Sequence, residues 1–469
     1  MSGPIRTLAG DFPATTPDNW RELAMRAIKG RDFDQTLVRT TQGGIPRGPI
    51  AFDSDLERPA GILPESRDSH LPWSISQTYV ASNPSKANAA ILADLTGGVS
   101  AIELTLDKTG QRGISVTGLD ELSRAIEGVD PSLAPVHLSP GSVPEHAQWL
   151  AKILASRVSD CLSLQAGFGL RPDDSNAYAF AQETQESLPQ SLAIQIDGRA
   201  VHDAGGHEIQ ELAFAALGLN QAMRGLLSHG IEPDQAAKRI GLTLAVDADI
   251  HLSISKLRAA RRIWTSIMEG FDVSKPNRRG HIKALTSFRM MAARDPWTNL
   301  IRLSSAGFAG AVGGADTLTI RCLTDAIGRP TAFGHRLSRN LQILLQEESH
   351  LGRVADPAGG AFLHEQLTEK LAQTAWSAFQ QLEREGGYEA AVSGEGFTGE
   401  LAKAKTKLID AYAAREDILV GVNQHVPDEV RPIAASDSNW KANLPTAPFE
   451  PMRIAASFEA ANTAEGGSQ

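Results

Sequence analysis

The stretch LAIQIDGRAVHDAGGHEIQELAFAALGLNQAMRGLLSHGIEPDQAAKRIGLTLAV, residues 192–246, decides the fold. It opens with a short aliphatic run at 192–196, continues through a long amphipathic segment at 207–228, and closes with a second aliphatic run at 240–246. A strand, a helix and a second strand in this order predict a right-handed βαβ unit whose two strands lie parallel in one sheet. The stretch therefore indicates the α/β class.

The same alternation continues on both sides of this unit. Further strand candidates lie at 101–106, 134–138, 162–167, 282–286 and 317–322, and helical patterns lie at 119–126, 144–155, 177–186 and 257–271. With an eighth strand expected near Val354, the pattern favours a closed (β/α)8 TIM barrel over an open doubly wound sheet. The glycines from Gly307 to Gly314 follow a helical pattern and miss the GxGxxG spacing of a dinucleotide-binding sheet.

Two flanking segments differ from this pattern. Residues 1–70 hold one short helical stretch around Trp20 and a Pro/Gly-rich run, with too few apolar residues for a core of their own. They predict an N-terminal arm that packs on the barrel or on a neighbouring subunit. We expect the barrel to occupy residues 71–421, and residues 422–469 to form an extended tail or truncated linker.

Composition narrows the functional classes. The net charge of -10 argues against nucleic-acid binding, and the alternation of Arg258, Arg261 and Arg262 with apolar residues predicts a solvated helix side rather than a basic patch. The sequence shows no secretory signal and no apolar run of membrane-spanning length, and Cys161 and Cys322 are too few for a disulfide framework. A cytoplasmic protein without membrane contact is expected.

Generic site motifs are missing from the sequence. It contains no HExxH, no paired CxxC, no GxSxG and no P-loop, so we expect no metal site and no hydrolytic centre. His202 and His207 flank a glycine-rich turn, where helix capping explains them better than metal binding. The residue pattern alone describes a barrel without assigned chemistry.

A family resemblance supplies what the generic motifs do not. SRNLQILLQEESHLGRVADPAGGAFLHE, at 338–365, resembles the most recognisable stretch of the methylmalonyl-CoA mutase family. KLRAARRIW at 256–264 is similar to that family's helix after the fifth strand, and PWSISQ at 72–77 is similar to the start of its substrate-binding segment. A weaker match covers Trp20 to Phe33 in the arm. The resemblance implies a TIM barrel, in agreement with the alternation of strands and helices.

The resemblance also implies a chemistry. In that family the barrel encloses an acyl-CoA thioester along its axis, and a separate C-terminal Rossmann-like domain presents adenosylcobalamin, whose radical abstracts a substrate hydrogen. The protein holds the thioester and excludes water. Matching positions imply that Ser74, Gln77, Tyr79 and Arg258 are vestigial substrate-binding residues, and a structural role is equally open for Arg258 on its helix.

Departures from the family pattern concern the residues that would contact the thioester. Ser76 and Thr78 stand where catalytic chains carry an arginine and a tyrosine, and Arg199 and Ala200 replace a Tyr-His pair after the fourth strand. His202 lies two residues further on, a shift that should point its ring elsewhere.

A second departure lies in the family's Gly-His-Thr-Gln run, which becomes Gly314, Ala315, Asp316 and Thr317. Losing one preorganised hydrogen-bond donor costs about 100- to 1000-fold in rate, and several are lost together. We therefore expect no catalytic residue in this chain.

The cofactor half of the family pattern is incomplete as well. Asp249 and His251 match the start of the cobalamin motif DxHxxG, but Ile254 stands where glycine is required and the residues fall in a barrel loop. We expect no cobalamin-binding Rossmann-like domain within the 469 residues, no cofactor bound by this chain, and adenosylcobalamin on a partner subunit.

The sequence leaves three hypotheses. The first makes the chain the non-catalytic small subunit of a heterodimeric methylmalonyl-CoA mutase in propionate metabolism, an isomerase complex whose large subunit interconverts methylmalonyl-CoA and succinyl-CoA. The second makes it the acyl-CoA-binding chain of a split mutase with a separate cobalamin polypeptide, and the third an acyl-CoA-binding or regulatory barrel. An obligate interface would bury on the order of 2,000 Å² or more. Whether Arg199 plugs the former active site or pairs with Asp197 or Asp203 is left open by the sequence.

Overall fold

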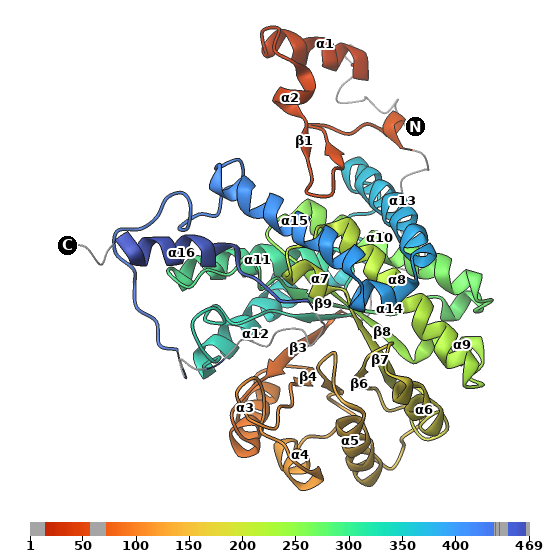
Figure 1. Ribbon diagram of the computed structural model, residues 1–469. Helices are drawn as coiled ribbons and strands as arrows, with labels where there is room; N and C mark the ends of the chain where they lie inside the picture. The colour runs from red at the N-terminus through yellow and green to blue at the C-terminus, as the bar shows by residue number, and fades with distance from the viewer. Residues whose placement is uncertain (1–14, 57–71, 436, 438–439, 441–448, 466–469) are drawn as a thin grey trace, which may run out of the picture.

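The chain folds around a closed barrel of eight parallel strands in the order β10-β3-β4-β5-β6-β7-β8-β9 (Figure 1). The computed structural model describes residues 15–56, 72–435, 437, 440 and 449–465. The barrel strands are β3 (Ser74–Tyr79), β4 (Ala101–Leu104), β5 (Val136–Leu138), β6 (Ala166–Leu170), β7 (Leu192–Asp197), β8 (Ile240–Val246), β9 (His281–Thr286) and β10 (Thr317–Thr319). The (β/α)8 TIM barrel predicted from the sequence is confirmed.

Helices cover the outside of the barrel and bury the apolar faces of its strands. Every residue of β8 is buried, as expected of a strand with the lumen on one side and helices on the other. The helices around the barrel are α3 (Pro84–Thr96), α4 (Leu119–Ala125), α5 (Pro144–Arg157), α6 (Ser175–Glu183), α7 (Arg199–Asp203), α8 (Glu208–Ser228), α9 (Pro233–Lys238), α10 (Ile250–Gly270), α11 (Pro296–Val312), α12 (Ala332–Glu347), α13 (Phe362–Arg384), α14 (Gly387–Ser393) and α15 (Glu395–Ala413).

The prediction of an eighth strand near Val354 is wrong. Val354 follows a 3-10 turn, η3 (Leu351–Arg353), and its side chain is 51% exposed. The missing strand is β3, which pairs with β4 and β10 and closes the barrel. Four of the six residues in its sequence, SISQTY, are polar, because Ser74, Ser76 and Thr78 face a polar lumen and Gln77 bonds the His335 carbonyl, so it lacks the aliphatic run that marked the other strands.

The N-terminal arm stands away from the barrel (Figure 1) and includes α1 (Pro17–Ala27), α2 (Phe33–Leu37), the hairpin strands β1 (Arg39–Thr40) and β2 (Pro46–Arg47), and η1 (Asp53–Asp55). Trp20 packs edge-on against Phe33 and Phe52, while α1 buries no residue. The hairpin joins the arm to the barrel, because Ile45 enters the main core and Arg47 pairs with Asp249. Residues 1–14 and 57–71 of the predicted arm lie outside the described residues.

The tail expected to be extended contains a helix, α16 (Ile454–Glu465). Met452 donates its backbone N–H to Asp203, and Ile454 donates to Arg289, both near the carboxyl ends of barrel strands. Met452, Ile454 and Ala455 pack in a small apolar cluster with α15. The sequence did not reveal this helix, because IAASFEAANTAE is short and has only two large apolar residues, Ile454 and Phe458. Residues 436, 438–439, 441–448 and 466–469 lie outside the described residues.

The arginines of α10 do not form the expected solvated side. Arg258 and Arg261 are buried, with 1% and 4% exposure. Arg261 pairs with Asp316 below the barrel and Arg262 pairs with Glu369 of α13. Buried acidic partners, which a local sequence pattern cannot reveal, neutralise this helix face.

Candidate functional site

The barrel lumen is the position at which the resemblance places the acyl-CoA, and residues from all eight strands line it. Only about 10 Å³ of free volume remains, roughly the space of one water molecule. The residues lining this space are Ser76, Glu103, His137, Leu138, Pro140, Gly167, Leu192, Gln195, Thr243, His281, Lys283 and Thr317.

An ion pair between Glu103 of β4 and Lys283 of β9 occupies the lumen. Both residues are buried, with 2% and 8% exposure. The other Glu103 carboxylate oxygen accepts hydrogen bonds from Ser139, at 3.0 Å, and from Thr78, at 3.3 Å. A buried carboxylate needs such partners to offset its lost hydration, and here both oxygens are bonded.

Two histidines, His137 and His281, lie between this ion pair and the amino-terminal end of the barrel. His281 hydrogen-bonds through Nε2 to the Thr317 hydroxyl at 3.0 Å. The His137 ring lies against Gly167, where an added Cβ would meet its Nδ1 at 2.4 Å. Burial, reinforced by His281, lowers the pKa of His137 to about 3, so its ring is neutral at pH 7. The lumen therefore contains one compensated ion pair and neutral polar groups.

A polar pocket of about 350 Å³ opens at the amino-terminal end of the barrel. Ser74, Gln165, Gln190, Lys238 and Arg279 contribute to its wall. His137, Leu192, His281 and Thr317 line both this pocket and the small lumen space, so these four residues separate the two.

The structure divides the predicted substrate-binding residues between two sides of β3. Ser74 and Ser76 line the lumen spaces. Gln77 and Tyr79 belong to the other face of the same strand and point into the helix layer, because successive side chains of a strand alternate. The Gln77 side-chain amide donates to the His335 carbonyl at 3.1 Å.

Tyr79 takes part in a buried cluster that joins β3, α3 and α12. Its hydroxyl donates to Asp94 at 3.2 Å, and its ring stacks on His335. Asp94 also bonds His335 and Arg339, the arginine of the family-like stretch. Burial and the Asp94 carboxylate raise the pKa of Tyr79 well above its usual value. These contacts hold helices against the barrel.

Arg258 lies in the helix layer, in a buried cluster between α10 and α13. Its guanidinium bonds Asp356 at 2.9 Å, Glu365 at 2.8 Å and the Thr368 hydroxyl at 3.2 Å. The fully buried guanidinium thus bonds two carboxylates and a hydroxyl, and these contacts hold α10 against α13. Whether any of Ser74, Gln77, Tyr79 and Arg258 contacts an acyl-CoA stays a prediction.

Arg199 and Ala200, at the end of β7, begin the short helix α7 above the lumen. The Arg199 guanidinium pairs with Asp197 through two hydrogen bonds, of 2.8 and 3.2 Å. Of the alternatives that the sequence left open, the structure therefore selects the Asp197 pair. Ala200 and Ala315 are fully buried and present no polar group.

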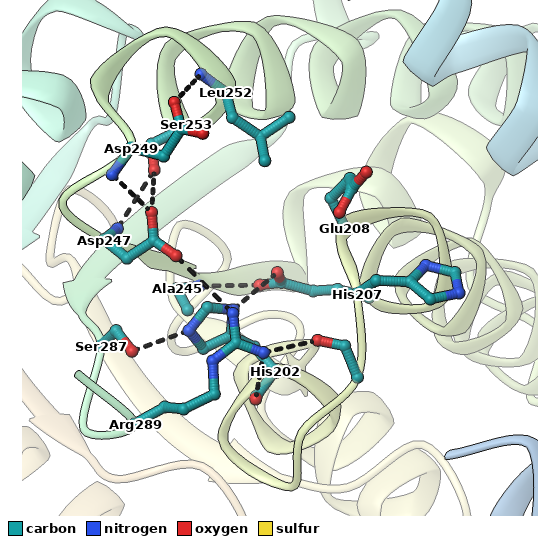
Figure 2. Close-up of polar contacts among 12 residues, drawn as sticks. His202, His207, Glu208, Ala245, Asp247, Asp249, Leu252, Ser253, Ser287 and Arg289 are labelled. Carbon is teal, nitrogen blue, oxygen red and sulfur yellow. Dashed lines mark hydrogen bonds and ion pairs between the residues drawn. The ribbon is translucent and has the colours of Figure 1, made fainter. Parts of the chain in front are cut away.

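His202 belongs to a buried polar network beside the lumen (Figure 2). Its Nε2 and the Ser287 hydroxyl lie 2.7 Å apart, while its Nδ1 lies 3.8 Å from Glu211, which pairs with Lys256. Arg289 donates to the His202 and Gly206 carbonyls. Burial, together with the charge of Arg289, lowers the pKa of His202 well below its usual range. Ser287 is fully buried, so this pair presents no accessible nucleophile.

A pocket of about 500 Å³ lies between this network and the arm. The hairpin contributes Thr41 and Arg47, the barrel contributes His202 and Arg289, and the chain after α15 contributes Val420. Arg47 pairs with Asp249, and Arg289 lies 3.7 Å from Asp247. The charges around this pocket are largely matched within the protein.

Comparison with known proteins decides the family. A family model described as methylmalonyl-CoA mutase matches residues 171–444. A methylmalonyl-CoA mutase small subunit from Streptomyces virginiae is 33% identical over 91% of this chain and 73% of its own length. The chain belongs to the methylmalonyl-CoA mutase family. A probable small subunit from Mycobacterium tuberculosis is 34% identical over 84% of this chain and 64% of its own length.

The relatives of this mutase-family chain differ in description and in length. A protein named methylmalonyl-CoA mutase from Cereibacter sphaeroides is 27% identical over 90% of this chain and 66% of its own length. The chain thus spans about two thirds to three quarters of the length of these relatives. No helix among the described residues combines the length and apolar character needed to cross a bilayer.

The mutase-family stretch at 338–365 serves the framework of this chain. The Trp73 indole donates to Gln342 at 3.1 Å, and the Gln346 amide donates to the Trp73 carbonyl at 2.7 Å. Asp356 and Glu365 hold Arg258. The residues that carried the family resemblance therefore bind helices to one another and to β3.

Sequence reasoning missed Glu103 and Lys283, although a signal was present. Each stands between apolar residues of its strand, in AIEL of β4 and in HIKALT of β9. Strands of a parallel barrel are buried on both faces, so a charge within one must find a partner inside the barrel. One acidic and one basic interruption indicate such a pair.

The residues of the partial DxHxxG motif do not fit a cobalamin ligand set. Asp249 caps α10 by accepting from the Leu252 N–H and pairs with Arg47. His251 faces His364 on the outside of the helix layer. Asp249 of this motif thus caps α10 and ties the arm hairpin to the barrel through Arg47.

Proposed function

We propose that this chain is the non-catalytic small subunit of a heterodimeric, adenosylcobalamin-dependent methylmalonyl-CoA mutase. The filled lumen carries this proposal. A thioester arm along the axis needs a continuous channel, whereas Glu103, Lys283 and His137 occupy the axis and leave about 10 Å³.

The carboxyl-terminal end of β7 gives independent support. The position that the family uses for a Tyr-His pair carries Arg199, whose donors bond Asp197. His202 is the nearest histidine in sequence to this position. Its ring bonds Ser287 beside the lumen, so it does not replace the missing imidazole as a donor to the thioester. A thioester carbonyl would therefore lack the oriented neutral donors that lower the barrier in such sites.

The partner would be the large mutase subunit, which would hold adenosylcobalamin and the substrate. The names of the Streptomyces and mycobacterial relatives contain the words small subunit. The arm supports a partnership, because α1 buries no residue within this chain and Leu23, one helical turn after Trp20, is 55% exposed. An exposed amphipathic helix gains stability by covering its apolar face.

The test compares three preparations: the chain alone, the chain co-expressed with a large mutase subunit, and the chain with an isolated cobalamin-binding domain. Each is supplied with adenosylcobalamin and methylmalonyl-CoA, and succinyl-CoA is measured. We expect turnover and a one-to-one complex only with the large subunit. Turnover with the isolated domain would overturn the proposal and establish the split-mutase alternative.

Equilibrium dialysis of the chain alone against methylmalonyl-CoA provides a second measurement. We expect no binding, because the lumen is filled. The double variant Glu103→Ala, Lys283→Ala is the matched comparison, since it removes the two side chains that fill the axis. Tight binding by the unmodified chain would contradict the proposal.

A further inference from the structure

Two histidines from different helices face each other on the outside of the helix layer. His251 lies in the first turn of α10 and His364 in the first turn of α13. His251 Nδ1 and His364 Nε2 are 3.1 Å apart, and the ring centroids are 5.2 Å apart. Neither residue belongs to the lumen or to the His202 network.

The two helices hold this geometry firmly. Arg258 of α10 binds Asp356 and Glu365, and Arg262 binds Glu369, one helical turn after Glu365. These ion pairs lie within two to three turns of the histidines. Buried contacts thus fix the two helices relative to each other, and the imidazoles they carry share one hydrogen bond.

The separation of the two nitrogens matches a metal chelate. With metal–nitrogen bonds of about 2.0 to 2.1 Å, two ligands on one tetrahedral or octahedral ion lie about 3.0 to 3.4 Å apart. His251 is exposed, so an ion can approach from solvent. The other nitrogen of His364, Nδ1, is buried and has no hydrogen-bond partner among the described residues. A proton on that nitrogen leaves the Nε2 lone pair facing His251.

We propose that His251 and His364 form a two-histidine site for a divalent transition-metal ion such as Zn²⁺, Ni²⁺ or Cu²⁺. Imidazole ligands favour these ions over Mg²⁺ and Ca²⁺, which prefer oxygen. Within the described part of the chain, no three of His, Cys, Asp and Glu gather as a metal-ligand group. Water therefore completes the coordination, and the ion is exchangeable rather than permanently held.

A bound ion would join the starts of α10 and α13 beside the root of the arm. Asp249, two residues before His251, caps α10 and pairs with Arg47 of the arm hairpin. An ion that binds the folded chain and not the unfolded one stabilises the fold by mass action. The site would thus strengthen the part of the barrel to which the arm is attached.

The test uses the full chain without an affinity tag and one equivalent of Cu²⁺, monitored by electron paramagnetic resonance, with Ni²⁺ affinity measured by calorimetry. We expect one ion per chain and two imidazole nitrogens in the spectrum. His251→Ala and His364→Ala should each retain at most one of these nitrogens and weaken binding by at least about tenfold, because even the loss of a supporting residue has effects of that size.

His425→Asn provides the matched control. His425 is exposed and has a positive φ of 54°, which asparagine tolerates. This variant should bind as the unmodified chain does. Because His251 is exposed, His251→Ala should keep its unfolding temperature in the absence of metal. Unchanged Cu²⁺ spectra and Ni²⁺ affinity in both His251→Ala and His364→Ala would overturn the proposal.

Discussion

Glu103 on β4 and Lys283 on β9 form an ion pair inside the barrel, although β3 and β10 stand between their strands. Both groups are buried, and burial lowers the pKa of Lys283 to about 7, so its charge depends on the neighbouring Glu103 carboxylate. We expect Lys283→Met to destabilise the chain by about 3 to 5 kcal/mol, because it leaves the Glu103 carboxylate without its cation. Glu103→Leu combined with Lys283→Met should cost clearly less. Urea unfolding of the two single variants and the double variant measures this coupling, and additive losses would contradict it.

The neutral ring of His137 predicts a specific sensitivity to acid. Its pKa is lowered to about 3 in the folded chain, from about 6.5 when unfolded. As pH falls from 6.5 toward 3, the unfolded chain binds a proton that the folded chain does not, so stability falls by about 1.4 kcal/mol per pH unit from this residue. His137→Gln should show a correspondingly shallower loss. Equal slopes in urea unfolding at pH 7, 6 and 5 would show that His137 is not responsible.

Arg258 should act on stability and not on substrate affinity. Arg258→Met leaves Asp356 and Glu365 buried without their cation, and we expect a loss of about 3 to 5 kcal/mol. The complex with a large subunit, assayed below the unfolding temperature, should keep its KM for methylmalonyl-CoA. Arg278→Met is the control, since Arg278 pairs with an exposed Glu269 and such pairs contribute about 0 to 1 kcal/mol. A raised KM in Arg258→Met alone would restore the substrate-binding role.

Tyr79 gives a parallel test on β3. Tyr79→Phe removes the hydroxyl that bonds the buried Asp94, and we expect a loss of about 1 to 3 kcal/mol. Because Tyr79 points away from the lumen, kcat of the reconstituted complex should stay unchanged. A large fall in kcat at equal stability would place Tyr79 in the chemistry.

Glu208 holds the hairpin through which the arm joins the barrel, so replacing it should have a local effect. Its carboxylate accepts from the Thr41 hydroxyl at 2.5 Å and from the Gly43 N–H at 3.1 Å. Glu208→Ala should loosen the hairpin and increase proteolytic cleavage within residues 39–47, while the barrel unfolds at nearly the same temperature. Glu22→Ala, which removes only a surface pair with Arg26, should not change cleavage. Protection of the hairpin in Glu208→Ala would show that other contacts hold the arm.

Seven of the eight barrel strands could be predicted from the local sequence pattern. The eighth, the polar strand β3, could not. Aliphatic runs such as 240–246 identified seven strands because burial on both faces requires apolar residues. β3 escaped because Ser74, Ser76 and Thr78 alternate with its outward residues. The family stretch at 338–365 identified the barrel despite this omission.

The candidate site could be predicted only in part, since side-chain direction depends on register and on distant partners. Sequence matching named Ser76, Thr78 and Thr317, which do line or bond within the lumen. It also named Tyr79 and Arg258, whose partners Asp94 and Asp356 lie in other elements. No local pattern shows that an arginine will meet a carboxylate 98 residues away.

The backbone bonds from Met452 to Asp203 and from Ile454 to Arg289 set an order of events during synthesis. At a translation rate of about 5 to 20 residues per second, Ile454 is made roughly 10 to 30 seconds after Arg289. During that interval the carboxyl-terminal face of the barrel lacks this covering segment, and Ala292, later packed near Met452, lacks part of its apolar surroundings. Once Thr319 has been made, all eight strands exist while this covering segment does not, so the carboxyl-terminal face of the barrel is exposed to aggregation until residue 454 follows.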